Sequence, residues 1–174
     1  MRPERAHEDN LVEVPHDFYK LHCFVTLTAD VMFVNSVPFL VTLSRKIRLR
    51  TAEHIPNRSV ASLGSSLKKV MQMYGRGGFV VNMIMADQEF EKLEESLGKL
   101  IEFNTAAARE HVGEIERSNR TTQERARAVS SVFPYVFLPK QVVIHLVYYV
   151  TTMLNCCINK QGISNYLSPR EIVL

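Results

Sequence analysis

The chain contains few cysteines and no long, uninterrupted apolar run. Its three cysteines are Cys23 and the adjacent pair Cys156 and Cys157, a spacing that fits neither a disulfide framework nor a CxxC metal site. The longest apolar stretch, 142–158, is interrupted by histidine, threonine and asparagine and is short for a membrane span. We therefore expect a reducing compartment, no membrane partner, and a pair of thiols that fill space in a buried helix.

The composition excludes two further classes of protein. Hydrophobic residues make up 46% and charged residues 22% of the 174 residues, which is typical of a folded globular domain and not of a disordered chain. The first residues, MRPERAHEDN, lack the apolar segment of a secretory signal, so we do not expect secretion. A net charge of +3 is compatible with a polyanionic partner and does not require one.

The order of polar and apolar segments predicts one α/β domain. Residues 1–20 are polar and show no sustained periodicity, which predicts a flexible lead-in before a folded domain over residues 21–174. In this domain, three apolar stretches separated by short polar turns predict an antiparallel meander, followed by alternating helices and strands. The predicted strands are 24–34, 37–43, 47–55, 79–85 and 100–103, and the predicted helices are 57–74, 88–97, 104–132 and 140–158. This order predicts a mixed five-stranded sheet flanked by helices.

An aspartate lies in the middle of the first apolar stretch. Strand alternation places Asp30 on the same face as Thr28 and Met32. A carboxylate buried in a strand loses its hydration unless a cation meets it, and hard divalent cations with oxygen ligands are one solution. The alternative is a solvated residue on an exposed face of the sheet. Because no basic residue lies nearby in the sequence, we favour a functional role for Asp30.

Two further acidic positions are candidates, and each has a simpler explanation. Asp87 ends the fourth predicted strand, where α/β sheets often hold ligands, but an aspartate directly before a helix is also a good N-cap. The long helix carries several glutamates interleaved with arginines, a pattern typical of a solvated helix face. These glutamates are Glu110, Glu114, Glu116 and Glu124. Periodicity alone does not separate them.

Basic residues gather at three places, any of which is able to neutralise phosphate groups without reading base sequence. A short alternating run predicts a third strand with one basic face, and the other two groups lie in the first long helix and beside Glu116. The three groups are Lys46, Arg48 and Arg50; Lys68 and Lys69; and Arg117 and Arg120. Ordinary solvated surface remains an alternative explanation for each group.

Four segments together resemble the polyproteins of copia-type retrotransposons. Over residues 111–127, HVGEIERSNRTTQERAR is similar to the glutamate-bearing helix of copia-type integrases, whose pattern is roughly Asn-Gly-Val-x-Glu-Arg-x-Asn-Arg. The matching positions are Gly113, Glu116, Arg117, Asn119 and Arg120. The four segments are TADVMFVNSVPFLVTLSR, NMIMADQEFEKL, NTAAAREHVGEIER and GISNYLSPREIVL. The likeness covers about residues 20–174 of the chain.

The resemblance implies a ribonuclease H-like integrase catalytic core. Its implied catalytic residues are Asp30, Asp87 and Glu116, which would hold two Mg²⁺ or Mn²⁺ ions, with Glu114 open as an alternative third ligand. The implied reaction is cleavage near the ends of element DNA and transfer of the exposed 3′-hydroxyls to target DNA. The residues expected to contact the DNA backbone are Arg117, Arg120, Lys68 and Lys69.

The same resemblance implies a homodimer located in the nucleus or in a cytoplasmic element particle. No structural zinc is expected, because His16 and His22 have no CxxC pair to complete a site. The alternative function is that of a catalytically silent, integrase-derived module that binds DNA or dimerises.

Overall fold

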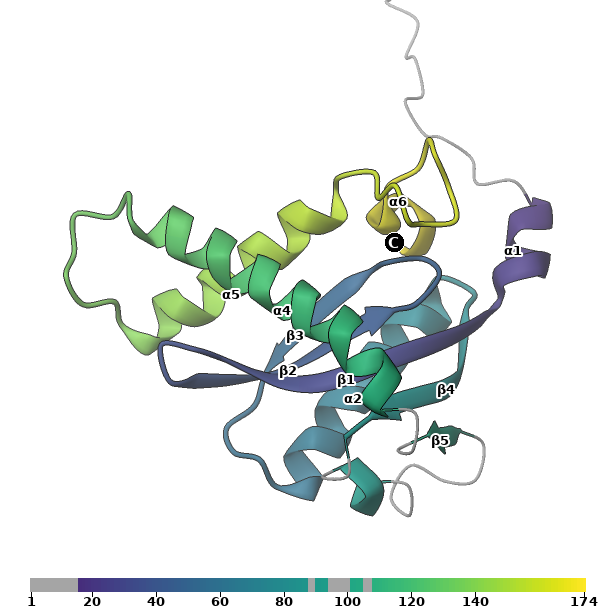
Figure 1. The fold of residues 1–174 in the computed structure, drawn as a ribbon, viewed down its shortest axis with the longest axis horizontal. Coiled ribbons are helices and arrows are strands. Elements are labelled where there is room, and N and C mark those ends of the chain that lie inside the picture. Colours follow the sequence, from purple (N-terminus) through teal and green to yellow (C-terminus); the bar gives the residue numbers. More distant parts are fainter. Residues whose placement is uncertain (1–15, 88–89, 94–100, 105–107) are drawn as a thin grey trace, which may run out of the picture.

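The computed structural model describes residues 16–174, except 88–89, 94–100 and 105–107. Figure 1 shows a twisted sheet with α2 packed on one face and with α4 and α5 packed on the other. In chain order, the elements are α1 (His16–His22), β1 (Phe24–Val34), β2 (Val37–Ser44), β3 (Arg50–His54), α2 (Val60–Arg76), β4 (Val80–Ala86), β5 (Glu102–Asn104), α4 (Ala108–Ser130), α5 (Lys140–Asn155) and α6 (Pro169–Val173).

The sheet has five strands in the order β3-β2-β1-β4-β5. β1, β2 and β3 are antiparallel neighbours, while β4 pairs parallel with β1 and β5 pairs parallel with β4. Asn35 and Ser36 form the turn between β1 and β2 with φ angles of 46° and 62°, which suit the twist of a tight hairpin. The predicted mixed five-stranded sheet flanked by helices is therefore confirmed.

The sheet separates two apolar layers, because side chains alternate along its strands. Leu27 and Ala29 of β1 belong to the layer that α2 covers, whereas Met32 and Val34 belong to the layer that α4 and α5 cover. Asp30 lies on the α4 side of β1, as the alternation predicts.

Local signals in the sequence set the ends of α2. Ser59 caps its first turn, because its hydroxyl accepts a hydrogen bond from the Ser62 backbone N–H at 3.3 Å. Gly77 follows the last helical residue, and a Cβ at this position would clash with the Val173 carbonyl of α6. Glycine is needed here because the C-terminal helix packs closely against the end of α2.

Two predictions made from apolar runs are wrong. The third strand begins at Arg50 and not at residue 47, because residues 45–47 form a turn and Arg48 has a left-handed φ of 66°. The run from Lys46 to Arg50 is therefore not a strand with one basic face. The two adjacent cysteines, expected in a buried helix, lie beyond the end of α5 and are exposed.

Two short helices were not predicted: α1, which begins at His16 inside the predicted lead-in, and α6. The helix predicted over 104–132 begins at Ala108 and ends at Ser130. Residues 90–93 are helical, and the rest of the predicted 88–97 helix lies outside the described residues. None of the helices in the described part of the chain is both long and apolar enough to cross a membrane.

Candidate functional site

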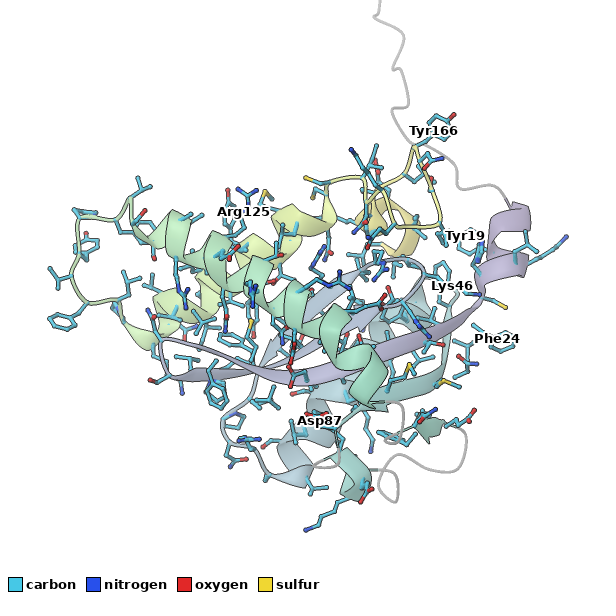
Figure 2. The ribbon with its side chains drawn as sticks, viewed as in Figure 1. Tyr19, Phe24, Lys46, Asp87, Arg125 and Tyr166 are labelled. Carbon is cyan, nitrogen blue, oxygen red and sulfur yellow. The ribbon has the colours of Figure 1, made fainter. Side chains whose placement is uncertain are left out.

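The strand register brings two of the predicted carboxylates to neighbouring positions. β1 and β4 run parallel, and their pairing ends with Ala29 opposite Ala86. Asp30 follows Ala29 within β1, and Asp87 directly follows the last residue of β4. Neighbouring strands lie about 4.8 Å apart. Asp87 is exposed where β4 ends, and Figure 2 labels it there. The two aspartates therefore lie side by side at the carboxyl end of β4.

Asp30 is partly buried beneath α4 and is held by hydrogen bonds. Its Oδ2 accepts a bond from the side-chain Nδ2 of Asn119 at 2.7 Å, and its Oδ1 accepts a bond from the backbone N–H of Val31 at 2.7 Å. These bonds replace part of the hydration that the carboxylate loses on burial. The alternative of a freely solvated residue on an outer face is therefore wrong.

α4 is oriented by a stripe of small and apolar residues that faces the sheet. The buried members of this stripe recur at helical spacing and are Ile115, Ser118, Thr122 and Ala126. The helix packs across β1, β2 and β4. The side chains on either side of the stripe form two flanks, one toward Asp30 and one toward the β2–β3 turn.

The flank toward Asp30 carries Glu116, Asn119 and Gln123. Asn119 contacts Asp30, and the Gln123 side-chain Nε2 donates to the Phe33 carbonyl at 3.0 Å. Glu116 is exposed one turn before Asn119, and side chains three residues apart on a helix have Cβ atoms about 5–6 Å apart. This flank borders an open cavity of about 600 Å³, lined by Glu116, Asn119, Arg120, Gln123, Glu124 and Arg127.

The opposite flank carries Glu114, and this placement separates the two competing glutamates. Glu114 Oε1 lies 3.3 Å from Arg48 Nη2, and its Oε2 lies 3.9 Å from Arg45 Nε. Because residues 114 and 116 are about 200° apart around a helix, only one of them shares the flank of Asn119. Glu116 is therefore the better candidate for a third carboxylate beside Asp30.

The carboxylates have the chemistry to bind a hard divalent cation. Asp30, Asp87 and Glu116 offer carboxylate oxygens, the donor type that Mg²⁺ and Mn²⁺ prefer. Among the residues that the structure describes, no three His, Cys, Asp or Glu side chains are grouped closely enough to hold a metal ion. The amide of Asn119 occupies the position next to Asp30, and Glu116 stands one turn away. The two aspartates thus offer donors of the right kind for a cation, while the third ligand is not assembled.

The four basic residues predicted to contact DNA do not form one surface. Arg120 lies on the flank of Glu116, whereas Arg117 lies on the flank of Glu114 and donates its Nε hydrogen to the Gly113 carbonyl at 2.9 Å. The other two, Lys68 and Lys69, are exposed on α2, which covers the opposite face of the sheet. The α4 arginines, and not the α2 lysines, lie on the side of the sheet that holds Asp30.

Sequence reasoning did not select Asn119 as a site residue. Its spacing of three residues from Glu116 places both on one helix flank, which is a usable signal. The contact with Asp30 joins residues 89 positions apart, so it depends on how α4 crosses the sheet.

Comparison with solved structures places the fold among integrase catalytic cores. The catalytic core domain of BIV integrase superimposes with a TM-score of 0.60 and 19% identity, covering 85% of this chain and 92% of that chain. The magnesium complex of the HTLV-2 integrase catalytic core domain, in a trimeric form, superimposes with a TM-score of 0.59 and 14% identity. This match covers 86% of this chain and 95% of that chain. No family model and no curated protein matches the sequence. The chain therefore has the ribonuclease H-like fold of integrase catalytic cores.

Proposed function

We propose that this chain is an integrase-like polynucleotidyl transferase that cleaves DNA ends and joins them to target DNA, as copia-type retrotransposon integrases do. The observation that carries the proposal is the register of β1 and β4, which brings the backbone positions of Asp30, beneath α4, and of the exposed Asp87 next to each other. In an α/β sheet, the carboxyl ends of parallel strands are the usual place for a ligand. The likeness in fold to two integrase cores supports the same assignment.

Each residue of the site has a distinct task in this proposal. Asp30, Asp87 and Glu116 would hold Mg²⁺ or Mn²⁺. When bound, two such ions activate an attacking hydroxyl and stabilise the leaving oxygen in displacement at phosphorus. Asn119 holds the Asp30 carboxylate in one orientation through its 2.7 Å hydrogen bond. Arg120 is exposed on the same flank of α4 and would neutralise a backbone phosphate.

The direct test is Mn²⁺ binding, which does not depend on a complete DNA complex. Titration calorimetry should detect binding to the unmodified chain, and Asp30→Asn or Asp87→Asn should abolish it. The control is Glu124→Gln, because Glu124 lies on the same helix about 12 Å beyond Glu116. Metal-dependent cleavage of a short DNA duplex should likewise be lost in Asp30→Asn and Asp87→Asn and retained in Glu124→Gln. Equal Mn²⁺ binding by all four proteins would refute the metal-dependent function.

A catalytically silent, integrase-derived module is the second candidate. The observation that favours it is the hydrogen bond that the Asn119 amide donates to Asp30. Among the described residues, Glu116 does not form a group of three possible metal ligands with the two aspartates. This candidate predicts DNA binding that responds to salt and to loss of arginine, with no response to Mn²⁺. The same Mn²⁺ titration distinguishes the two candidates.

Assembly and location follow from the proposed function. We propose that the chain forms a homodimer and acts in the nucleus or in a cytoplasmic element particle, because its DNA substrates are found there. Sedimentation of the purified chain would test the dimer, and a monomer at all concentrations would contradict it.

A further inference from the structure

A second, smaller cavity lies on the flank of α4 that carries Glu114. It has a volume of about 210 Å³ and lies between α4, the start of β3 and the loop that follows α5. Apart from Leu43, its lining is polar, and the side chains that matter most are Arg48, Arg50, Glu114, Arg117, Ser118 and Thr121. Sites for drug-sized ligands are usually about 300–1,000 Å³, so this cavity suits one small polar group.

The side chains that line the cavity carry a net positive charge. Arg48, Arg50 and Arg117 line it together with one carboxylate, so three positive charges and one negative charge leave a formal charge of +2. That carboxylate, Glu114, is already paired with Arg48 at 3.3 Å. The cavity on the Glu116 flank is different, because its two arginines are matched by two glutamates.

The arginines are held by contacts that leave donors available. Arg50 Nε donates to the Ser118 hydroxyl at 3.0 Å, and Arg117 Nε donates to a backbone carbonyl at 2.9 Å. In the described part of the chain, the terminal amino groups of Arg50 and Arg117 make no hydrogen bond. The buried Nε of Arg48 also lacks an acceptor among these residues. Fixed guanidinium groups with spare donors are suited to an oxyanion.

The pKa of Arg50 agrees with a site that would be stabilised by an added negative charge. Burial, followed by the positive charge of Arg48, lowers the pKa of Arg50 below its ordinary value. Both causes disfavour the protonated guanidinium, and an anion between the two arginines would offset them.

We propose that this cavity binds a phosphate group of a nucleic-acid backbone, at a site separate from the carboxylates. Arginine matches the geometry of phosphate oxygens, and the Ser118 hydroxyl, which accepts from Arg50, adds a neutral donor typical of backbone contacts. The cavity is on the other flank of a helix about 10–12 Å wide. The cavity would therefore hold a phosphate group other than the one that reacts beside the carboxylates. The choice of nucleic acid as the partner rests on the proposed function.

The test measures DNA binding without metal, so it does not depend on catalysis. Affinity of the full chain for a short fluorescent duplex is measured by anisotropy in EDTA, between about 50 and 200 mM salt. Arg117→Gln and Arg50→Gln should each weaken binding and reduce the slope of log K against log salt by about 1. The matched control is Arg125→Gln. Figure 2 labels this exposed residue, which lies on the same helix about 12 Å beyond Arg117.

Each outcome decides the proposal. The assignment of this cavity would be overturned if Arg117→Gln left the slope of log K against log salt unchanged. It would also be overturned if Arg125→Gln lost as much DNA affinity as Arg117→Gln. If Arg50→Gln does not fold, Arg117→Gln decides, because Arg117 is exposed and its side-chain hydrogen bond is to its own helix.

A second arm distinguishes a backbone phosphate from a free anion. The Nε–H signals of ¹⁵N-labelled arginines are followed by NMR while inorganic phosphate or duplex DNA is added. Shifts of the Arg50 signal with DNA support the proposal. Shifts with phosphate alone, without a change in the DNA slope, would show a small-anion site and overturn the nucleic-acid assignment. Failure of Mn²⁺ binding would contradict the proposed catalysis and leave these results unaffected.

Discussion

Replacing Asn155 tests how α5 is fastened to the edge of the sheet. Asn155 is the last residue of α5 and is only 7% exposed. Its Oδ1 accepts a hydrogen bond from the Arg50 backbone N–H at 2.9 Å, and its Nδ2 donates to the Arg50 carbonyl at 2.7 Å. One side chain thus satisfies both backbone groups of the first residue of β3. Asn155→Leu keeps the approximate volume and removes both bonds.

The expected cost follows from the two bonds. Leaving a buried donor or acceptor without a partner costs about 1–3 kcal/mol, and the partial exposure of Arg50 favours the lower half of this range. Two such groups give about 2–4 kcal/mol of lost stability. For a domain of this size, each kcal/mol lowers the melting temperature by about 2–4 °C, so we expect a decrease of about 4–16 °C.

Urea unfolding followed by far-UV circular dichroism measures this loss, with the exposed Asn165→Leu as the control for the change of side chain. Native-state hydrogen exchange adds a local measurement, because the Arg50 amide should lose protection in Asn155→Leu and keep it in the control. A loss of stability below about 0.5 kcal/mol, the lower limit for one ordinary hydrogen bond, would refute the reasoning. Water would then be satisfying the Arg50 backbone groups.

Three further predictions concern single positions. Gly77→Ala should cost about 1–3 kcal/mol in urea unfolding, because its Cβ meets the α6 backbone, whereas Gly75→Ala has open space and should cost nothing. Arg48→Gly should be more stable than Arg48→Ala by about 1–2 kcal/mol, because φ at this position is 66°; equal stability would contradict this. NMR titration should find the pKa of Glu171 below its ordinary value, because the Ser168 backbone N–H and then its hydroxyl stabilise the carboxylate. Ser168→Ala should raise that pKa, and the contribution of the contact to stability should be lost as the pH falls through it.

Most of the fold was predictable because its signals are local. Alternation along β1, the turn at Asn35 and Ser36, and the Ser59 cap each depend on a few neighbouring residues. The prediction failed where tertiary contacts override the local pattern. The apolar residues of the segment before Arg50 alternate like a strand, yet this segment turns, with Arg48 in a left-handed conformation and its side chain paired with α4.

The site was predictable in part for the same reason. Asp30 and Asp87 lie within or directly after strands, so a parallel pairing of those strands is enough to bring them together. No local pattern decides what α4 presents to them. That depends on how the helix is rotated, and its buried stripe of small residues sets the rotation. Once α4 is in place, Asn119 contacts Asp30, while Glu114 turns toward Arg48 and the smaller cavity that Arg48 lines. A change that rotates α4 should therefore perturb Mn²⁺ binding and DNA binding together, whereas Arg117→Gln should perturb DNA binding alone.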